Sequence, residues 1–167
     1  MSDDYYDLGD FRRDVTTSSP EAQLWFDRGL AWAYCFNPEE AVRCFRKAAT
    51  YDPDCAMAHW GIAFGSGPNY NKAWRLFDRA DMAKSIEVAQ AALERARKAA
   101  AKNATPFERA LIDALGPRFP DAPTQDEAEF DRLNHAYADA MRTFYKQFSD
   151  DIDAAALFGD ALICLSP

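Results

Sequence analysis

The sequence has no alternating runs of valine, isoleucine and threonine, so strand-rich folds are excluded. It also has no apolar run long enough to cross a bilayer. The first residues, Met1-Ser2-Asp3-Asp4, are acidic and no apolar segment follows them, so we expect no signal peptide. These absences predict an all-α, cytoplasmic protein without a membrane partner.

Excess positive charge is also missing, because the formal net charge is −8. Nucleic-acid binding requires a basic face on the protein. The densest cationic stretch, Arg95 to Lys102, falls on an expected helix, and we interpret it as a solvated helix face. The sequence therefore predicts no nucleic-acid partner.

The cysteines show no C-x-x-C spacing, and the two histidines form no H-E-x-x-H motif. The sequence thus predicts neither a metal site nor a cofactor. All four cysteines are expected to be free thiols, with the first three buried. They are Cys35, Cys44, Cys55 and Cys164.

One segment near the N-terminus combines aromatic and small residues at fixed spacings. In order they are Trp25, Gly29, Trp32, Ala41, Phe45, Ala48 and Pro53. Small residues at Gly29 and Ala41 allow two antiparallel helices to approach closely, and the aromatic rings fill the space between them. The order and spacing resemble the 34-residue tetratricopeptide repeat, with Arg28 where that pattern prefers leucine.

This resemblance implies an all-α, right-handed α-solenoid of antiparallel helix pairs, with about seven helices. Residues 1–18 are expected to form an N-terminal extension and residues 19–167 the helical domain. The expected pairs span residues 20–54, 55–102 and 105–148, and a half pair spans 151–167.

Capping residues predict where the helices begin. Ser19-Pro20 and Asn37-Pro38 each place a cap before a proline, with Glu40 positioned to complete a capping box. Pro53 is expected at the first position of the third helix. Two further capping boxes are expected at Thr105-Pro106-Phe107-Glu108 and Thr124-Gln125-Asp126-Glu127. A polar loop, residues 65–71, interrupts the second pair, residues 72–81 follow it, and we expect the regular helix to resume from about Met82 to Lys102.

In tetratricopeptide proteins the first helix of each pair lines a concave groove that binds peptides. By position, the resemblance implies that this groove is lined by Gln23, Phe26, Leu30, Tyr34, Met57, Trp60 and Phe64. Chaperone-binding members place lysine and asparagine where this sequence has Phe26 and Leu30, so a carboxylate clamp is missing. The favoured function is a protein-interaction scaffold that binds an apolar peptide or helix in the groove.

An enzyme or a small-ligand-binding protein is the alternative. Its site would combine His59 with the loop residues Asn69, Tyr70 and Asn71 and an acid such as Glu108. Each also has a structural interpretation, because His59 occupies a packing position and the asparagines are suited to capping turns. We favour the structural interpretation, and the sequence identifies no catalytic residue.

The expected last helix carries Leu157, Phe158, Leu162 and Leu165 without a following helix to cover them. This predicts self-association through that helix, or a partner segment from the remainder of a longer parent chain. The wider chain is similar to the start of a group of long repeat proteins of bacteria and fungi that carry a GPNYN loop, here Gly67 to Asn71.

Overall fold

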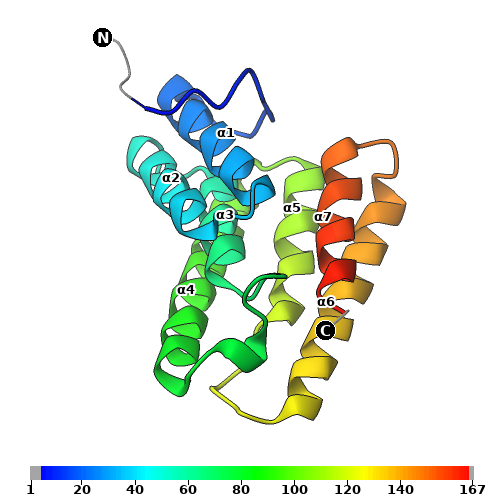
Figure 1. The fold of residues 1–167 in the computed structure, drawn as a ribbon. Helices are drawn as coiled ribbons and strands as arrows, with labels where there is room; N and C mark the ends of the chain where they lie inside the picture. Colours follow the sequence, from blue (N-terminus) through cyan, green and yellow to red (C-terminus); the bar gives the residue numbers. More distant parts are fainter. Residues whose placement is uncertain (1–4, 166–167) are drawn as a thin grey trace.

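The computed structural model describes residues 5–165, and within them the chain forms seven α-helices and no β-strand. The helices are α1 (Pro20–Tyr34), α2 (Pro38–Tyr51), α3 (Ala56–Ser66), α4 (Arg79–Asn103), α5 (Pro106–Leu115), α6 (Glu127–Gln147) and α7 (Ile152–Ile163). Figure 1 shows α1 to α4 on one side of the molecule and α5 to α7 on the other. Helices that follow each other in the sequence pack side by side, and α3 also packs on α1 and α5. The predicted all-α architecture of stacked helix pairs is confirmed.

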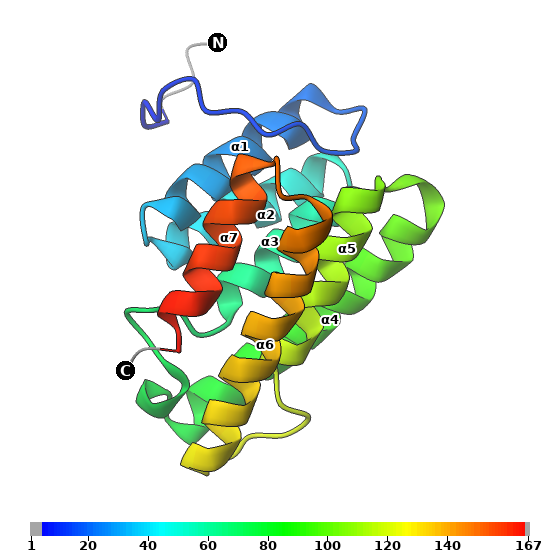
Figure 2. The same cartoon turned by 90° about the vertical axis from the view of Figure 1, so that its right-hand side faces the viewer.

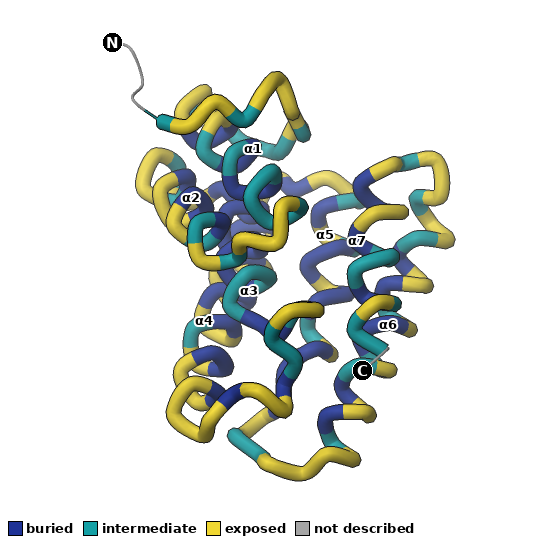
Figure 3. Tube along the Cα trace, viewed as in Figure 1, coloured by how far each residue is buried: buried dark blue, intermediate teal, exposed yellow. Residues whose placement is uncertain are grey.

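The core is continuous across both groups of helices. Figure 3 shows buried segments along α3 and α5, between the two groups of helices, and exposed residues on many of the outer turns. An apolar stripe runs along α6 and is buried; it consists of Phe130, Leu133, Tyr137, Met141 and Phe144. Within the described residues no helix is long and apolar enough to cross a bilayer.

The ring of Phe45 is the closest contact point of the first three helices. A Cβ atom added to Gly29 of α1 would lie 2.6 Å from this ring, and one added to Gly61 of α3 would lie 2.5 Å from it. Phe45 itself is fully buried. The two glycines therefore provide the space that the α2 ring fills, as the sequence predicts for Gly29.

Two predicted helix starts are confirmed in detail. Ser19 caps α1 through its Oγ, which accepts from Ala22 N at 3.1 Å, and Pro20 is the first helical residue. Thr105 and Glu108 form the expected reciprocal capping box at α5.

The predicted start of α3 at Pro53 is wrong. Residues 52–54 form a turn instead, in which Cys55 N donates to Asp52 O at 3.1 Å. The side chain of Asp52 also accepts from Asp54 N at 3.0 Å. Such a side-chain turn competes with helix formation, so α3 begins only at Ala56.

The capping box predicted at Thr124 is also wrong. Asp126 is the N-cap of α6, and its carboxylate accepts from Ala128 N at 3.0 Å. Thr124 instead accepts from Asp126 N and donates its own backbone N–H to the sulfur of Met82. At α2 only half of the expected box forms, because Asn37 caps the helix while Glu40 binds other side chains.

The regular helix after α3 resumes close to the expected Met82, after an irregular segment. Asn69 and Lys72 exchange backbone hydrogen bonds, a short 3₁₀ turn covers Trp74–Leu76, and α4 begins at Arg79. Trp74 and Phe77 are buried in the core. The burial of these two rings holds residues 72–78 on an irregular path.

The last helix is better covered than the sequence predicts. Leu157 is buried, and Phe158 stacks on Tyr145 of α6 with ring centroids 5.5 Å apart. Leu162 and Leu165 are half-buried. The expected bare apolar face of α7 is therefore largely packed against α6.

The four cysteines are free thiols, but they differ in exposure. Cys44 and Cys55 are buried, and burial raises the pKa of Cys55 to about 11. Cys164 is half-buried. Cys35 is exposed at the end of α1, which corrects the expectation that it is protected.

A Gly61→Ala substitution should destabilise the fold by about 1–3 kcal/mol, because its methyl group overlaps the immobile Phe45 ring. Chemical denaturation measures this change. Gly159→Ala is the control, since its Cβ would meet nothing within 4 Å and alanine favours the interior of α7. An equal effect at both positions would contradict the packing described here.

The thiols should react with a thiol-counting reagent in three classes. Cys35 should react quickly and Cys164 more slowly, whereas Cys44 and Cys55 should react only after unfolding, because buried thiols do not form the reactive thiolate. Cys35→Ser should remove the fast phase alone. A fast phase that survives this substitution would show that another thiol is exposed.

Candidate functional site

Most of the residues expected to line the concave groove are buried in the core. Five of them belong to the buried core: Phe26, Leu30, Met57, Trp60 and Gln23 are each less than 7% exposed. Tyr34 and Phe64 are half-buried. Within residues 5–165 these side chains therefore do not form an open apolar groove, because other segments of the chain pack against them.

Residues 5–18 provide part of that cover, and we call them the strap. Figure 2 shows the strap crossing α1 above the start of α7. The amide of Gln23 binds its backbone on both sides: Val15 N donates to Gln23 Oε1 at 3.0 Å, and Gln23 Nε2 donates to Arg13 O at 2.7 Å. Arg13 N donates to the carboxylate of Asp27 at 3.0 Å. Two side chains of α1 thus bind an extended backbone.

The side chain of Arg13 ties the strap to the far group of helices. It binds Asp151 at 2.6 Å and Asp153 at 3.1 Å, at the start of α7. Its guanidinium also lies 4.1 Å from the ring centroid of Phe107 on α5. Asp153 accepts a further hydrogen bond from the Tyr34 hydroxyl at 2.6 Å. Arg13 therefore joins α1, α5 and α7.

These contacts shift the pKa values of two carboxyl groups in opposite directions. Burial raises the pKa of Asp27, and its hydrogen bonds from Arg13 and Gln23 only partly oppose this. Burial also acts to raise the pKa of Asp151, but the hydrogen bond from Arg13 and those from α7 backbone N–H groups hold it below its usual range.

Glu108 of α5 binds the next part of the strap, at Thr16. Its carboxylate accepts from Thr16 N at 2.7 Å and from Thr16 Oγ1 at 2.6 Å, and it accepts from Thr105 N at 2.7 Å as part of the capping box. Glu108 is only 4% exposed. The Glu108 carboxylate is thus occupied by hydrogen bonds to Thr16 of the strap and to Thr105 at the start of α5. It has a structural role, and we do not assign it a role in acid–base catalysis.

The start of the strap packs on the outer side of the first pair. The Tyr5 hydroxyl accepts from Trp32 Nε1 at 2.8 Å and donates to Glu40 at 2.9 Å. The guanidinium of Arg28 lies 4.5 Å from the Tyr5 ring centroid and 4.7 Å from that of Trp25. The arginine that departs from the repeat pattern thus stacks on a strap residue.

His59 lies in the first part of α3 with its Nε2 2.8 Å from Pro53 O, and it is 6% exposed. The loop of Asn69, Tyr70 and Asn71 follows the other end of this helix, roughly 12 Å further along at 1.5 Å per residue. His59 and the loop therefore do not form one site, and Glu108 belongs to neither. The enzymatic alternative has no assembled site here.

The loop is held from beneath by Arg118, which is 2% exposed. Arg118 donates to Pro68 O and lies 4.5 Å from the ring centroid of Tyr137. Asp160 lies 3.9 Å from its guanidinium; burial raises the pKa of Asp160, although Arg118 opposes this. The position of the loop is therefore set by a buried cation on the opposite group of helices.

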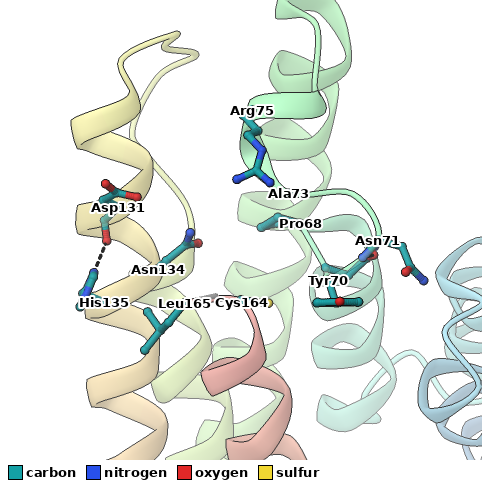
Figure 4. A pocket seen from close by; sticks show the side chains of 11 residues that line it. Pro68, Tyr70, Asn71, Ala73, Arg75, Asp131, Asn134, His135, Cys164 and Leu165 are labelled. Carbon is teal, nitrogen blue, oxygen red and sulfur yellow. Dashed lines mark hydrogen bonds between the residues drawn. The ribbon is translucent and has the colours of Figure 1, made fainter. Parts of the chain in front are cut away.

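Asn69 has the structural role that the sequence allowed. Its side-chain oxygen accepts from Asn71 N at 2.9 Å and from Lys72 N at 3.0 Å. Tyr70 and Asn71 remain exposed beside a cleft of about 370 Å³. Figure 4 shows His135 and its neighbours on α6 across this cleft from the loop.

Sequence reasoning missed the strap as a structural element. Residues 5–18 contain no helical periodicity, and their contacts reach as far as α7, 138 residues away for Arg13 and Asp151. Two local signals were available. They are the arginine at position 28 and the aromatic residues Tyr5, Tyr6 and Phe11 in an otherwise polar segment.

Comparison with known families supports the repeat itself. The sequence model described as Tetratricopeptide repeat matches residues 22–55, which cover α1, α2 and the turn before α3. No curated protein and no solved structure matches the chain. The matched segment is thus the first helix pair and the turn after it, and further helices pack against this pair.

Glu108→Ala should lower the free energy of unfolding by about 1.5–3 kcal/mol, because Thr16 and Thr105 lose a charged acceptor in a buried place. Glu127→Ala is the matched control, since it also removes an acid from the first turn of a helix but is exposed. Urea denaturation of both variants measures the difference. Equal losses would show that only the helix dipole is involved.

Proposed function

We propose that this chain is a protein-interaction scaffold whose concave face binds an extended, partly apolar protein segment. The observation that carries the proposal is the pair of α1 side chains, Gln23 and Asp27, that bind the backbone of residues 13–15. Tetratricopeptide repeats bind protein partners in general, and residues 22–55 match that family. In this chain the strap occupies the proposed binding position.

The strap has the chemistry expected of such a ligand. Phe11 packs edge-on against Tyr34 with ring centroids 5.8 Å apart, and Val15 packs against the core. Backbone hydrogen bonds from Gln23 and Asp27 are independent of the bound sequence, whereas the pocket for Arg13 selects one side chain. A partner segment would therefore combine an extended backbone, apolar side chains and one arginine.

The predicted groove residues divide into two roles in this proposal. Gln23 and Tyr34 contact the bound segment directly. The apolar residues Phe26, Leu30, Met57, Trp60 and Phe64 form the packed base beneath it and the contact with α5. The proposed specificity for a bound segment thus depends on the polar residues of the concave face, Gln23 and Tyr34.

Two finer expectations from the sequence stay predictions. One is that the chain belongs to a longer parent of the group with a GPNYN loop, whose remainder supplies the partner segment. The other is self-association through α7, where Ile152 and Ile163 are exposed. Light scattering across a dilution series tests the second.

The scaffold proposal is tested by adding the strap as a separate peptide to a variant whose own strap is weakened. A full-length variant with Arg13→Ala and Thr16→Val weakens its own strap, and a fluorescein-labelled peptide of residues 5–18 is then added. Fluorescence anisotropy should show saturable binding, because the peptide keeps the Arg13 side-chain contact to Asp151 and the Thr16 hydroxyl contact to Glu108, which the variant has lost.

The control is the same peptide with both substitutions. It should bind at least tenfold more weakly, since each lost hydrogen bond to a charged group is worth about 1.5–3 kcal/mol. A Gln23→Leu change in the chain should weaken both peptides. Absence of binding, or equal binding of the two peptides, would refute the proposal, provided that circular dichroism shows intact helices.

A further inference from the structure

A second surface lies on the outer side of the molecule, between α2 and α4. Helix α3 packs on both of these helices and forms the floor between them. The resulting groove has a volume of about 790 Å³. Its walls come from Arg46, Ala49 and Thr50 of α2 and from the exposed side of α4 between Glu87 and Lys102. This outer groove shares no residue with the strap or the concave face.

Cationic side chains dominate the walls of the outer groove. Arg46, Arg95, Lys98 and Lys102 line it, against the two acids Asp54 and Glu87. Lys102 is bound to Asp54 at 2.8 Å. Within residues 5–165, neither Arg46, Arg95 nor Lys98 forms an ion pair, and all three are exposed. Three cations that form no ion pair thus face one groove, against two acids, in a chain whose net charge is −8.

The positive lining continues along α2. A neighbouring cleft of about 680 Å³ shares Arg46 and adds Arg43, Lys72 and Lys84 to the lining. Arg43 binds Glu40 and Lys72 binds Asp81, whereas Lys84 forms no ion pair within the described residues. The cationic surface therefore extends from Lys102 toward the start of α4.

The floor between the charged walls is small and apolar. Ala49, Val88 and Ala91 are partly or fully accessible, and Ile62 of α3 lies beneath them. The one ring in the lining of the 790 Å³ groove is the imidazole of His59, which is only 6% exposed and bound to Pro53 O, so the described residues offer no open aromatic ring there. Nucleic-acid bases need such rings to stack on, so this lining is better suited to a peptide with carboxylates and small apolar side chains.

We propose that the outer groove binds an acidic segment of a partner protein. Its carboxylates would pair with Arg46 on one wall and with Arg95 and Lys98 on the other, and its small apolar side chains would cover Val88 and Ala91. The wall from Glu87 to Lys102 is roughly 22 Å long at 1.5 Å per helical residue. An extended segment of about seven residues spans that length.

The charge distribution also explains how such a partner would be selected. The cationic groove lies on a molecule that repels acidic proteins elsewhere, so association is directed to this face. Exposed charges are screened by salt, and binding should therefore weaken as ionic strength rises. Failure of this inference would leave the proposal for the concave face intact, because the two surfaces are separate.

The test uses the full chain labelled with ¹⁵N and the peptide Glu-Ala-Glu-Leu-Glu-Ala-Glu as the probe. In amide NMR spectra, shifts should concentrate at Arg46, Val88, Ala91, Arg95 and Lys98 and should shrink at least threefold between 50 and 300 mM NaCl (roughly 14 to 6 Å Debye length). The same peptide with glutamine at each glutamate should cause no comparable shifts. Equal shifts with both peptides, or shifts elsewhere, would overturn the proposal.

Matched charge reversals separate the groove from net charge. Arg46→Glu with Arg95→Glu should weaken binding at least tenfold. Arg79→Glu with Lys146→Glu changes the net charge equally, at exposed positions outside the groove, and should leave affinity within about twofold. Equal losses in both variants, or tighter binding of a single-stranded oligonucleotide than of the acidic peptide, would refute an acidic protein segment as the ligand.

Discussion

The ring of Phe45 lies between α1 and α3, where Gly29 and Gly61 leave room for it, and the close packing of the first three helices depends on this contact. Gly29 of α1 and Gly61 of α3 both lie against this ring, so neither position has room for a side chain. This contact fixes how α3 lies on the first pair. The concave face on one side and the outer groove on the other are both consequences of that placement.

The strap connects the two groups of helices, because it binds α1 on one side and α5 and α7 on the other. Gln23 and Asp27 bind its backbone, Arg13 reaches α7, and Thr16 reaches Glu108 on α5. Most of these groups are buried or half-buried, so their hydrogen bonds are shielded from water and matter more than surface pairs. The segment that resembles a loose extension in sequence is therefore part of the folded unit.

Helices and their pairing could be predicted from the sequence because the signals are local. Ser19-Pro20 and the box at Thr105 mark helix starts within four residues, and the apolar stripe of α6 repeats along one element. The predictions at Pro53 and Thr124 failed where a neighbouring aspartate formed the stronger local hydrogen bonds. The closed concave face could not be predicted, because it depends on contacts between residues more than a hundred positions apart. The outer groove could not be predicted either, because Arg46 and Arg95 lie on different helices and line one groove only when α3 packs on both α2 and α4.

The ion pairs of Arg13 with Asp151 and Asp153 connect the beginning of the described chain to its last helix. In an ordinary helical repeat each unit contacts only its neighbours, so the array can fray from either end without disturbing the middle. Here the strap and α7 bind each other, so the contacts between successive helices are closed into a ring. Opening that ring exposes α1 and α7 together, so loss of structure is concerted rather than sequential, and the closure itself must form late, after the intervening helices have brought its two halves together.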